Sequence, residues 1–155
     1  MTNRFRITTA VFAELEKILE LQKRSFLTQA KLYNDYQLPP LLQTLEEIQG
    51  EWEKKVFLVA NIDNVIIGSI RGHENNGTCF VERLFVDPEY RGNGIGLALL
   101  QEIENHFPQA VRFELFTGHK SENNIRMYES NGYRKTHEKP IHENLTVIYF
   151  EKTVS

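Results

Sequence analysis

The sequence predicts one mixed α/β domain over residues 1–155, with its elements in the order β-α-α-β-β-β-α-β-α-β-β. Two observations predict this class. Apolar residues alternate in some segments and recur at helical spacing in others, and the two kinds of segment are interspersed along the chain. The chain also has no internal repeat, no low-complexity segment and no clear linker, which favours a single domain.

The first half is predicted to hold a strand, two helices and three further strands. Apolar residues from Phe12 to Phe26 recur at helical spacing, and Pro39-Pro40 stands where the first turn of a helix tolerates proline. Two β-rich runs flank Asp63-Asn64, which favours a hairpin turn. The expected elements are a strand over residues 4–8, helices over 10–29 and 39–52, and strands over 57–60, 65–70 and 78–86.

The second half begins where a strand ends at Asp87-Pro88 and gives way to a glycine-rich turn. An amphipathic helix follows, with apolar residues at fourfold spacing from Ile95 to Phe107. Ser121 is expected to cap a later helix, which Gly132 ends. The remaining elements expected are a strand over residues 111–116, that helix over 121–131, and strands over 133–138 and 145–153.

Composition excludes several classes of protein. The chain carries 18 Lys+Arg against 21 Asp+Glu, and a net charge of −3 with scattered basic residues gives no reason to bind nucleic acid. No apolar stretch approaches the roughly 20 residues of a membrane helix. The five histidines and one cysteine form no metal-binding motif, so no metal is expected. Cys79 has no partner for a disulfide, and no secretory segment is recognised, which favours the cytoplasm.

Three glycines, Gly92, Gly94 and Gly96, alternate between a strand and a helix. Glycine lets backbone N–H groups converge on one point, and the helix adds the positive end of its dipole, so the turn predicts a phosphate or pyrophosphate site. The alternative is a tight turn that binds nothing. The other alternative is a dinucleotide site, in which Glu114 would be the acid that binds the ribose. The three glycines do not have the Gly-x-Gly-x-x-Gly spacing of such sites, which argues against it.

Two motifs resemble those of the GNAT N-acetyltransferase family. Arg91-x-x-Gly94-x-Gly96, after a strand that ends in Val86-Asp87-Pro88-Glu89-Tyr90, resembles the acetyl-CoA loop of that family. Residues 121–133 resemble its later helix, although Ser121 stands where Asn is common and Asn124 where Ala is common. The resemblance covers residues 4–153 in element order and implies a mostly antiparallel sheet of about seven strands flanked by about four helices.

The resemblance implies acetyl-CoA as the acyl donor. The pantetheine arm would run along the strand over 84–86, and the strands over 78–86 and 111–117 would splay apart to admit it. The pyrophosphate would rest on the glycine loop. The residues expected to bind the cofactor are Leu84, Phe85, Val86, Arg91, Gly92, Asn93, Gly94, Ile95, Gly96, Ser121, Asn124 and Tyr128.

Two residues are candidates for catalysis. Glu82 and Arg83 interrupt an apolar strand, so at least one of these charges is expected to face the interior or a cleft. A partly buried carboxylate suits a general base, and the resemblance gives Glu82 that role; the alternative is an ion pair or an exposed edge. The resemblance assigns Tyr128 to protonating the sulfur of CoA, and the alternative is a core tyrosine.

The segment between the first two helices holds the candidates for acceptor contacts. Tyr33, Asp35 and Tyr36 lie where similar proteins wall the acceptor site, and the alternative is a surface linker. Cys79 is a further possible nucleophile, but no histidine partner is identifiable, so an inert buried thiol is preferred.

The resulting hypothesis is an N-acetyltransferase that moves an acetyl group from acetyl-CoA to a primary amine by direct attack in a ternary complex. The acceptor would be a small-molecule or peptide amine, without nucleic-acid or membrane partners. The alternative is a non-catalytic acyl-CoA-binding sensor, which needs the glycine loop but neither Glu82 nor Tyr128. Similar proteins often pair through their last strands, so a homodimer is a further expectation.

Overall fold

The computed structural model describes residues 4–154, which form a seven-stranded sheet in the order β1-β2-β3-β4-β5-β7-β6. Only β4 and β5 pair in parallel, and the other neighbours are antiparallel. The mixed α/β class and the element order expected for the strands are confirmed. The strands are β1 Arg6–Thr9, β2 Val56–Ile62, β3 Val65–Asn75, β4 Thr78–Val86, β5 Arg112–Gly118, β6 Arg134–His142 and β7 Leu145–Thr153.

Five α-helices flank the sheet within residues 4–154, one more than the sequence predicts. The helix expected over residues 39–52 is two helices, because Gln43 is extended and Thr44 starts a new helix in a capping box with Glu47. The first helix continues to Tyr33 rather than ending near residue 29, and Asn34 in the left-handed region then ends it. The helices are α1 Leu15–Tyr33, α2 Pro39–Leu42, α3 Leu45–Glu51, α4 Ile95–Asn105 and α5 Glu122–Ser130.

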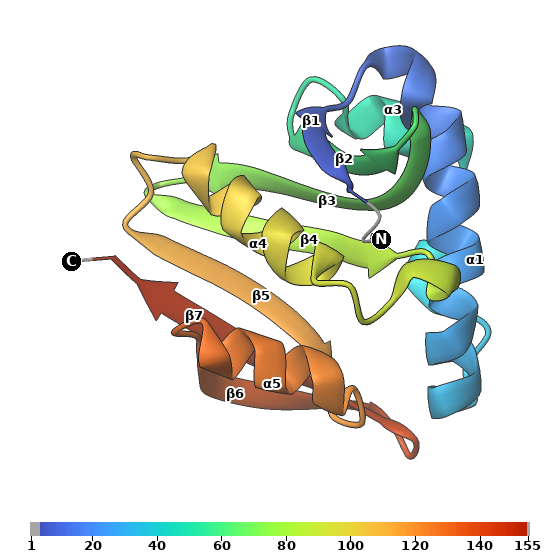
Figure 1. The fold of residues 1–155 in the computed structure, drawn as a ribbon. Coiled ribbons are helices and arrows are strands. Elements are labelled where there is room, and N and C mark those ends of the chain that lie inside the picture. Colours follow the sequence, from blue (N-terminus) through green and yellow to red (C-terminus); the bar gives the residue numbers. More distant parts are fainter. Residues whose placement is uncertain (1–3, 155) are drawn as a thin grey trace.

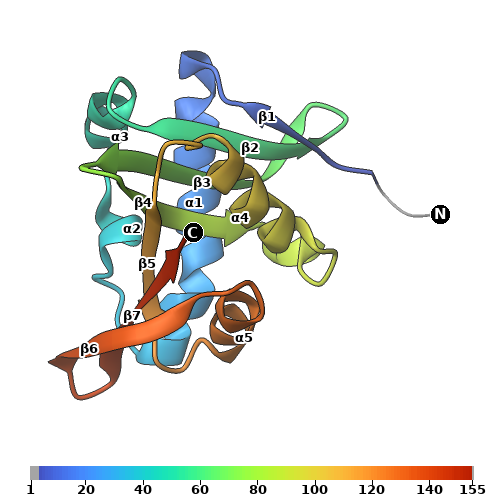
Figure 2. The ribbon, with the colours of Figure 1, turned by 90° about the vertical axis from the view of Figure 1, so that its left-hand side faces the viewer.

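The helices cover both faces of the sheet (Figures 1 and 2). On one face, α4 and α5 pack on a core that includes Leu99, Ile103 and Tyr128. On the other face, α1 and α3 enclose a second core around Ile18 and Phe57. Because successive residues of a strand point to opposite faces, β2 supplies side chains to both cores in alternation.

The sheet opens between β4 and β5. These strands pair only from Thr78 to Phe80 and from Arg112 to Glu114, and then separate. This finding confirms the predicted splay. The β3–β4 ladder also shifts by one residue opposite Ile70, where Arg83 has a φ of 52° and forms a bulge. Beyond Phe80, the β5-facing edge of β4 has no strand partner among residues 4–154.

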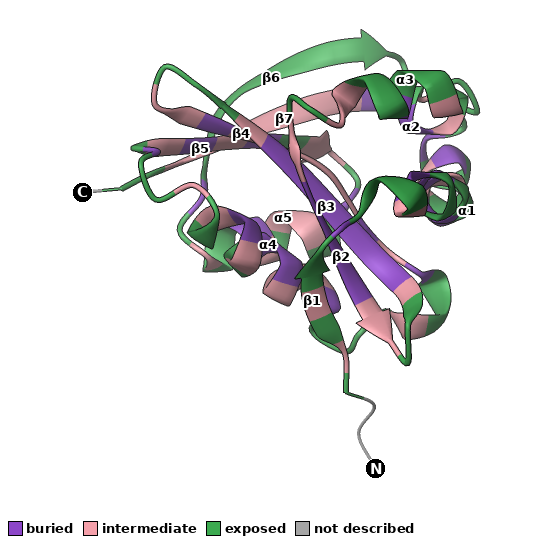
Figure 3. Ribbon diagram, turned by 90° about the horizontal axis from the view of Figure 1, so that it is seen from above, coloured by how far each residue is buried: buried purple, intermediate pink, exposed green. Residues whose placement is uncertain are grey.

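The far edge of the sheet is β6, which is exposed along its whole length (Figure 3). None of the helices in residues 4–154 has the length and apolar character needed to cross a bilayer.

Candidate active site

The glycine turn between β4 and α4 is an open backbone cradle. Gly92 and Gly94 have φ values of 83° and 78°, a region that other residues enter at a cost. A Cβ built on either glycine meets no atom within 4 Å. The helix α4 begins at Ile95 with Gly94 as its N-cap, so its free N–H groups point toward this open space. The cradle fits the phosphates of a nucleotide cofactor.

Side chains before the glycines attach this turn to α1. Arg91 donates hydrogen bonds to the carbonyl of Ser25, at 3.1 Å, and to the hydroxyl of Thr28, at 3.2 Å. Asp87 is buried, accepts a hydrogen bond from the N–H of Glu89 and forms an ion pair with Arg24. Arg91 therefore positions the loop against α1 in this structure, a contact that its motif alone does not reveal.

The strand β4 presents alternate residues to the two faces of the sheet. Leu84 and Val86 pack against the core under α4, whereas Phe85 belongs to the core under α1 and lies near Phe26, with ring centroids 6.2 Å apart. A Cβ built on Gly96 would lie 3.8 Å from Val86. The unpaired edge of β4 thus leads directly to the glycine turn, as an extended pantetheine arm requires.

Tyr128 lies on α5 and is buried against β7. Its ring centroid lies 6.0 Å from that of Tyr133 and 5.9 Å from that of Phe150. Burial raises the pKa of Tyr128, so its phenol remains protonated at neutral pH. Its ring belongs to the core, as the structural alternative expects, and the catalytic role of its hydroxyl stays a prediction.

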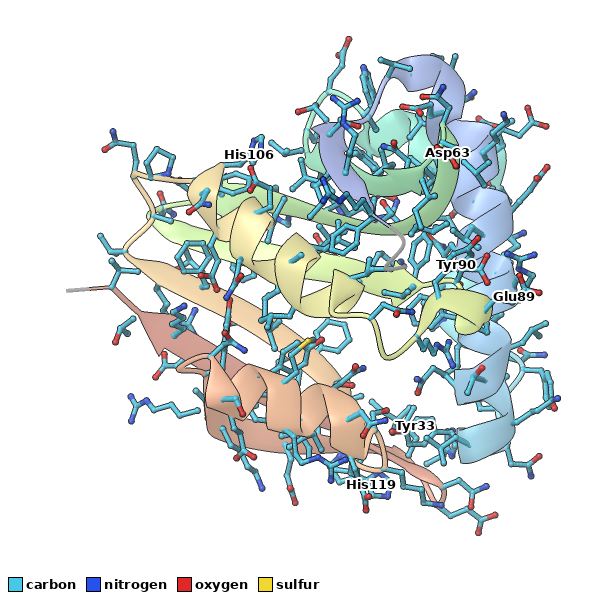
Figure 4. The ribbon with its side chains drawn as sticks, viewed as in Figure 1. Tyr33, Asp63, Glu89, Tyr90, His106 and His119 are labelled. Atoms are coloured by element: carbon cyan, nitrogen blue, oxygen red, sulfur yellow. The ribbon has the colours of Figure 1, made fainter. Side chains whose placement is uncertain are left out.

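The start of α5 is held by a chain of hydrogen bonds that begins on α1. The N–H of Lys120 donates to the hydroxyl of Tyr33, which bonds to Ser121, and Ser121 in turn donates to Gln29. Tyr33 and His119 lie side by side at this corner (Figure 4), with ring centroids 5.8 Å apart. Ser121 is the N-cap residue of α5, as expected, but its hydroxyl makes no capping hydrogen bond and is used in this network instead.

Asp35 and Tyr36 have different surroundings from Tyr33. Asp35 accepts a hydrogen bond from Nε2 of His142 at 2.9 Å, so the α1–α2 loop contacts the β6–β7 hairpin. The N–H of Gln37 and the imidazole of His142 hold the pKa of Asp35 below its usual range. Tyr36 is exposed, and Tyr33 is a buried helix residue rather than part of a surface linker.

Glu82 lies at the edge of a cavity of about 340 Å³ at the base of the splay. Its carboxylate lies 3.0 Å from Nζ of Lys55 and 3.0 Å from Nδ1 of His73. The ion pair considered from the sequence is therefore present, and it places the carboxylate beside the cavity. The residues lining the cavity are His73, Asn75, Phe80, Val81, Glu82, Glu114, Leu115, Phe116 and Tyr149.

Several of these neighbours were not identified from the sequence. Phe116 and Tyr149 form an aromatic pair on β5 and β7, with ring centroids 5.4 Å apart. Lys55 follows α3, so its position depends on how that helix packs on the sheet. The splay brings these residues together, and the pair of charges on an apolar strand, Glu82 and Arg83, was an indication of it in the sequence.

Cys79 lies outside this arrangement. It is fully buried in the core under α4, and burial raises the pKa of its thiol to about 12. A thiol that stays protonated is a poor nucleophile, which supports the inert interpretation.

Comparison with known proteins agrees with this geometry. A model of the acetyltransferase (GNAT) family matches residues 15–133. The uncharacterized N-acetyltransferase MJ1530 of Methanocaldococcus jannaschii is 34% identical over 92 residues, which are 56% of this chain and 59% of that protein. The chain aligns with 34% to 59% of the length of the curated relatives that it matches.

Solved structures share the fold. The PaiA N-acetyltransferase of Thermoplasma acidophilum, solved in complex with coenzyme A, superposes with a TM-score of 0.75 at 22% identity, over 97% of this chain and 99% of that one. YncA of Salmonella typhimurium, solved with its cofactor acetyl-CoA, gives 0.78 at 17% identity, over 99% and 95%. With the family model matching most of its length, the chain belongs to the acetyltransferase (GNAT) family.

Proposed function

We propose that the protein transfers the acetyl group of acetyl-CoA to a primary amine by direct attack in a ternary complex. The observation that carries this proposal is the splay of β4 and β5, with the glycine cradle at one end of the unpaired edge and a cavity bearing Glu82 at its base. Acetyl-CoA supplies an activated acyl carbon when it is bound. The cradle and strand edge would hold the donor, and the cavity would hold the acceptor.

Each group is proposed for a role that its chemistry allows. Glu82 takes a proton from the acceptor ammonium, which frees the lone pair that forms the new C–N bond. The N–H groups of the bulge near Leu84 donate to the carbonyl oxygen as negative charge develops on it. Tyr128 gives its proton to sulfur as the C–S bond breaks. The ammonium loses two protons per turnover, of which the thiol gains one and solvent receives the other.

The proposal is tested by CoA release from acetyl-CoA over a panel of amino acids, polyamines, aminoglycosides and short peptides, with mass spectrometry of the products. An acetylated amine is expected, and Glu82→Gln is expected to lower turnover by roughly 100-fold or more without loss of acetyl-CoA binding. Glu74→Gln, an exposed change on β3, is the matched control. Tight binding of acetyl-CoA without acetylation of any amine would support a sensor instead, and absence of binding would reject the donor site.

A further inference from the structure

A group of buried and partly buried charges lies beside the cavity, on the face of the sheet that α1 and α3 cover. Arg71 of β3 is almost fully enclosed and hydrogen-bonds to Gln22, and its guanidinium lies 3.7 Å from Glu51. Lys55 joins the two carboxylates of the group, because its Nζ lies 2.9 Å from Glu51 and 3.0 Å from Glu82. These contacts pair every charge named here with at least one opposite charge.

Arg83 is the third cation of this group, and it is not paired. It makes no hydrogen bond or ion pair with any other residue in the range 4–154, and its Nε is fully buried without a partner. Burial lowers the pKa of Arg83, and the charges of Glu51 and Glu82 act against that effect, so the guanidinium lies within electrostatic reach of both carboxylates. Lys55, Arg71 and Arg83 thus exceed Glu51 and Glu82 by one positive charge.

The backbone presents Arg83 at the point where the strands separate. Its φ of 52° is rare for a residue with a side chain, and it forms the bulge that interrupts the β3–β4 ladder. A strained backbone conformation costs free energy, and such conformations gather at active sites and ligand sites. A buried polar atom without a partner, such as Nε of Arg83, costs free energy as well. Glu82 lines the cavity and its charge acts on the guanidinium of Arg83, so this cation lies close to the proposed reaction centre, although Arg83 itself does not line the cavity.

A carboxylate is the group that fits this guanidinium. The planar fork of arginine matches two carboxylate oxygens, and one negative charge balances the single positive charge in excess. The acceptor must also present an amine to Glu82. In an α-amino acid one carbon separates the amine from the carboxylate, so an acid held by Arg83 keeps its amine beside the neighbouring residues of β4.

We propose that the acceptor is a free α-amino acid, whose carboxylate binds Arg83 and whose side chain enters the cavity lined by Phe80, Phe116 and Tyr149. This inference rests on the proposed acetyl transfer and specifies its substrate class. The aromatic walls of the cavity favour an apolar or aromatic side chain.

The test compares the proteinogenic L-amino acids with their α-amides and with the matching decarboxylated amines, for example phenylalanine, phenylalaninamide and phenethylamine. Two readouts are used: kcat/KM from CoA release, and calorimetric binding of the same compounds to the protein loaded with CoA. We expect the amino acid to exceed its amide by about 10- to 100-fold in both readouts, which is the range for hydrogen bonds to charged groups.

Arg83→Gln is expected to remove the preference for the amino acid over its amide. The variant should lower kcat/KM for the amino acid by the same factor of about 10- to 100-fold and should change kcat/KM for the amide by less than about twofold. Arg83→Asn, which tolerates a positive φ, provides a second variant if the first does not fold. Arg134→Gln, on the exposed strand β6, is the matched control. Acetyl-CoA binding and thermal melting show that each variant keeps its fold.

The outcomes separate this inference from the proposed function. Equal acetylation of acids and amides, or a preference that survives in Arg83→Gln, overturns the inference and leaves acetyl transfer standing. Binding that depends on the carboxylate and on Arg83, without turnover of any amine, supports the inference and rejects the proposed reaction. If the CoA-loaded protein binds no amino acid and acetylates none, the inference is wrong.

Discussion

The hydroxyl of Tyr33 lies 2.7 Å from Oγ of Ser121, which is 88 positions later in the chain. This contact fixes the C-terminal end of α1 to the start of α5. The hydroxyl also accepts a hydrogen bond from the N–H of Lys120, so one side chain binds two residues of the β5–α5 connection. Gly118 permits this arrangement, because a Cβ there would collide with the ring of Tyr33.

Tyr33→Phe is therefore expected to lower the free energy of unfolding by about 1–3 kcal/mol, because buried hydrogen-bonding groups lose their partner. Urea denaturation measures this change. The KM for acetyl-CoA is expected to rise several-fold, since α5 carries Asn124 and Tyr128. Tyr36→Phe, at an exposed position three residues beyond α1, is the control for loss of a hydroxyl. Equal stability of the two variants would contradict this role of Tyr33.

Gly94→Ala tests the phosphate cradle. The φ of Gly94 is 78°, so a side chain there costs about 1–2 kcal/mol even though the space around it is open. The turn is expected to shift its N–H groups, and acetyl-CoA affinity measured by calorimetry should fall by about tenfold. Gly50→Ala in α3, where the added methyl also meets no atom, is expected to leave affinity unchanged. Unaltered affinity in Gly94→Ala would show that the loop is not the phosphate site.

Tyr128→Phe separates the catalytic from the structural interpretation of this residue. The ring stays in the core, so the free energy of unfolding should change by less than about 1 kcal/mol, while kcat falls by roughly 100-fold if the phenol is the proton donor. The control is Tyr133→Phe, which packs against Tyr128 and loses its hydrogen bond to Glu104. That variant should lose stability and keep its kcat. An unchanged kcat in Tyr128→Phe would remove the residue from the mechanism.

Arg71→Met tests the buried charge network. Arg71 is almost fully enclosed, and burial lowers its pKa to about 10, an effect that the charge of Glu51 opposes. Its removal takes the hydrogen-bond donor from Gln22 and Gln43, whereas Glu51 keeps its ion pair with Lys55. The free energy of unfolding, measured in urea, is therefore expected to fall by about 1–3 kcal/mol. Arg126→Met on the exposed face of α5 should change stability by less than about 0.5 kcal/mol. A neutral Arg71→Met would mean that the network adds no stability.

The sequence predicts the fold and the donor side of the site better than the acceptor side, for a physical reason. The glycine turn and α5 depend on residues near one another in the chain, so their spacing identifies them. The break between α2 and α3 depends on Gln43, which hydrogen-bonds to Gln22 on α1, a contact that no local pattern reveals. Likewise, the environment of Arg83 combines α3 and two strands, and only the folded chain brings them together.

The last prediction concerns stability at alkaline pH. Burial raises the pKa of Cys79 to about 12, and it also raises the pKa values of Tyr128 and Tyr133. In the unfolded chain the thiol ionises near pH 8.5 and the phenols near pH 10. Above those values the folded protein binds more protons than the unfolded chain, so the free energy of unfolding must fall as pH rises.

We expect the free energy of unfolding to be unaffected by these groups below about pH 8.5. Above that pH the thiol alone should lower it by about 1.4 kcal/mol per pH unit, and the fall should become steeper once the phenols of the unfolded chain ionise near pH 10. Urea titrations between pH 7 and pH 11 measure the slopes below and above pH 10. Cys79→Ala should remove the fall that begins near pH 8.5 and keep the steeper one above pH 10, because the tyrosines remain. If wild type and Cys79→Ala have the same slope between these limits, the thiol is not held protonated in the folded protein.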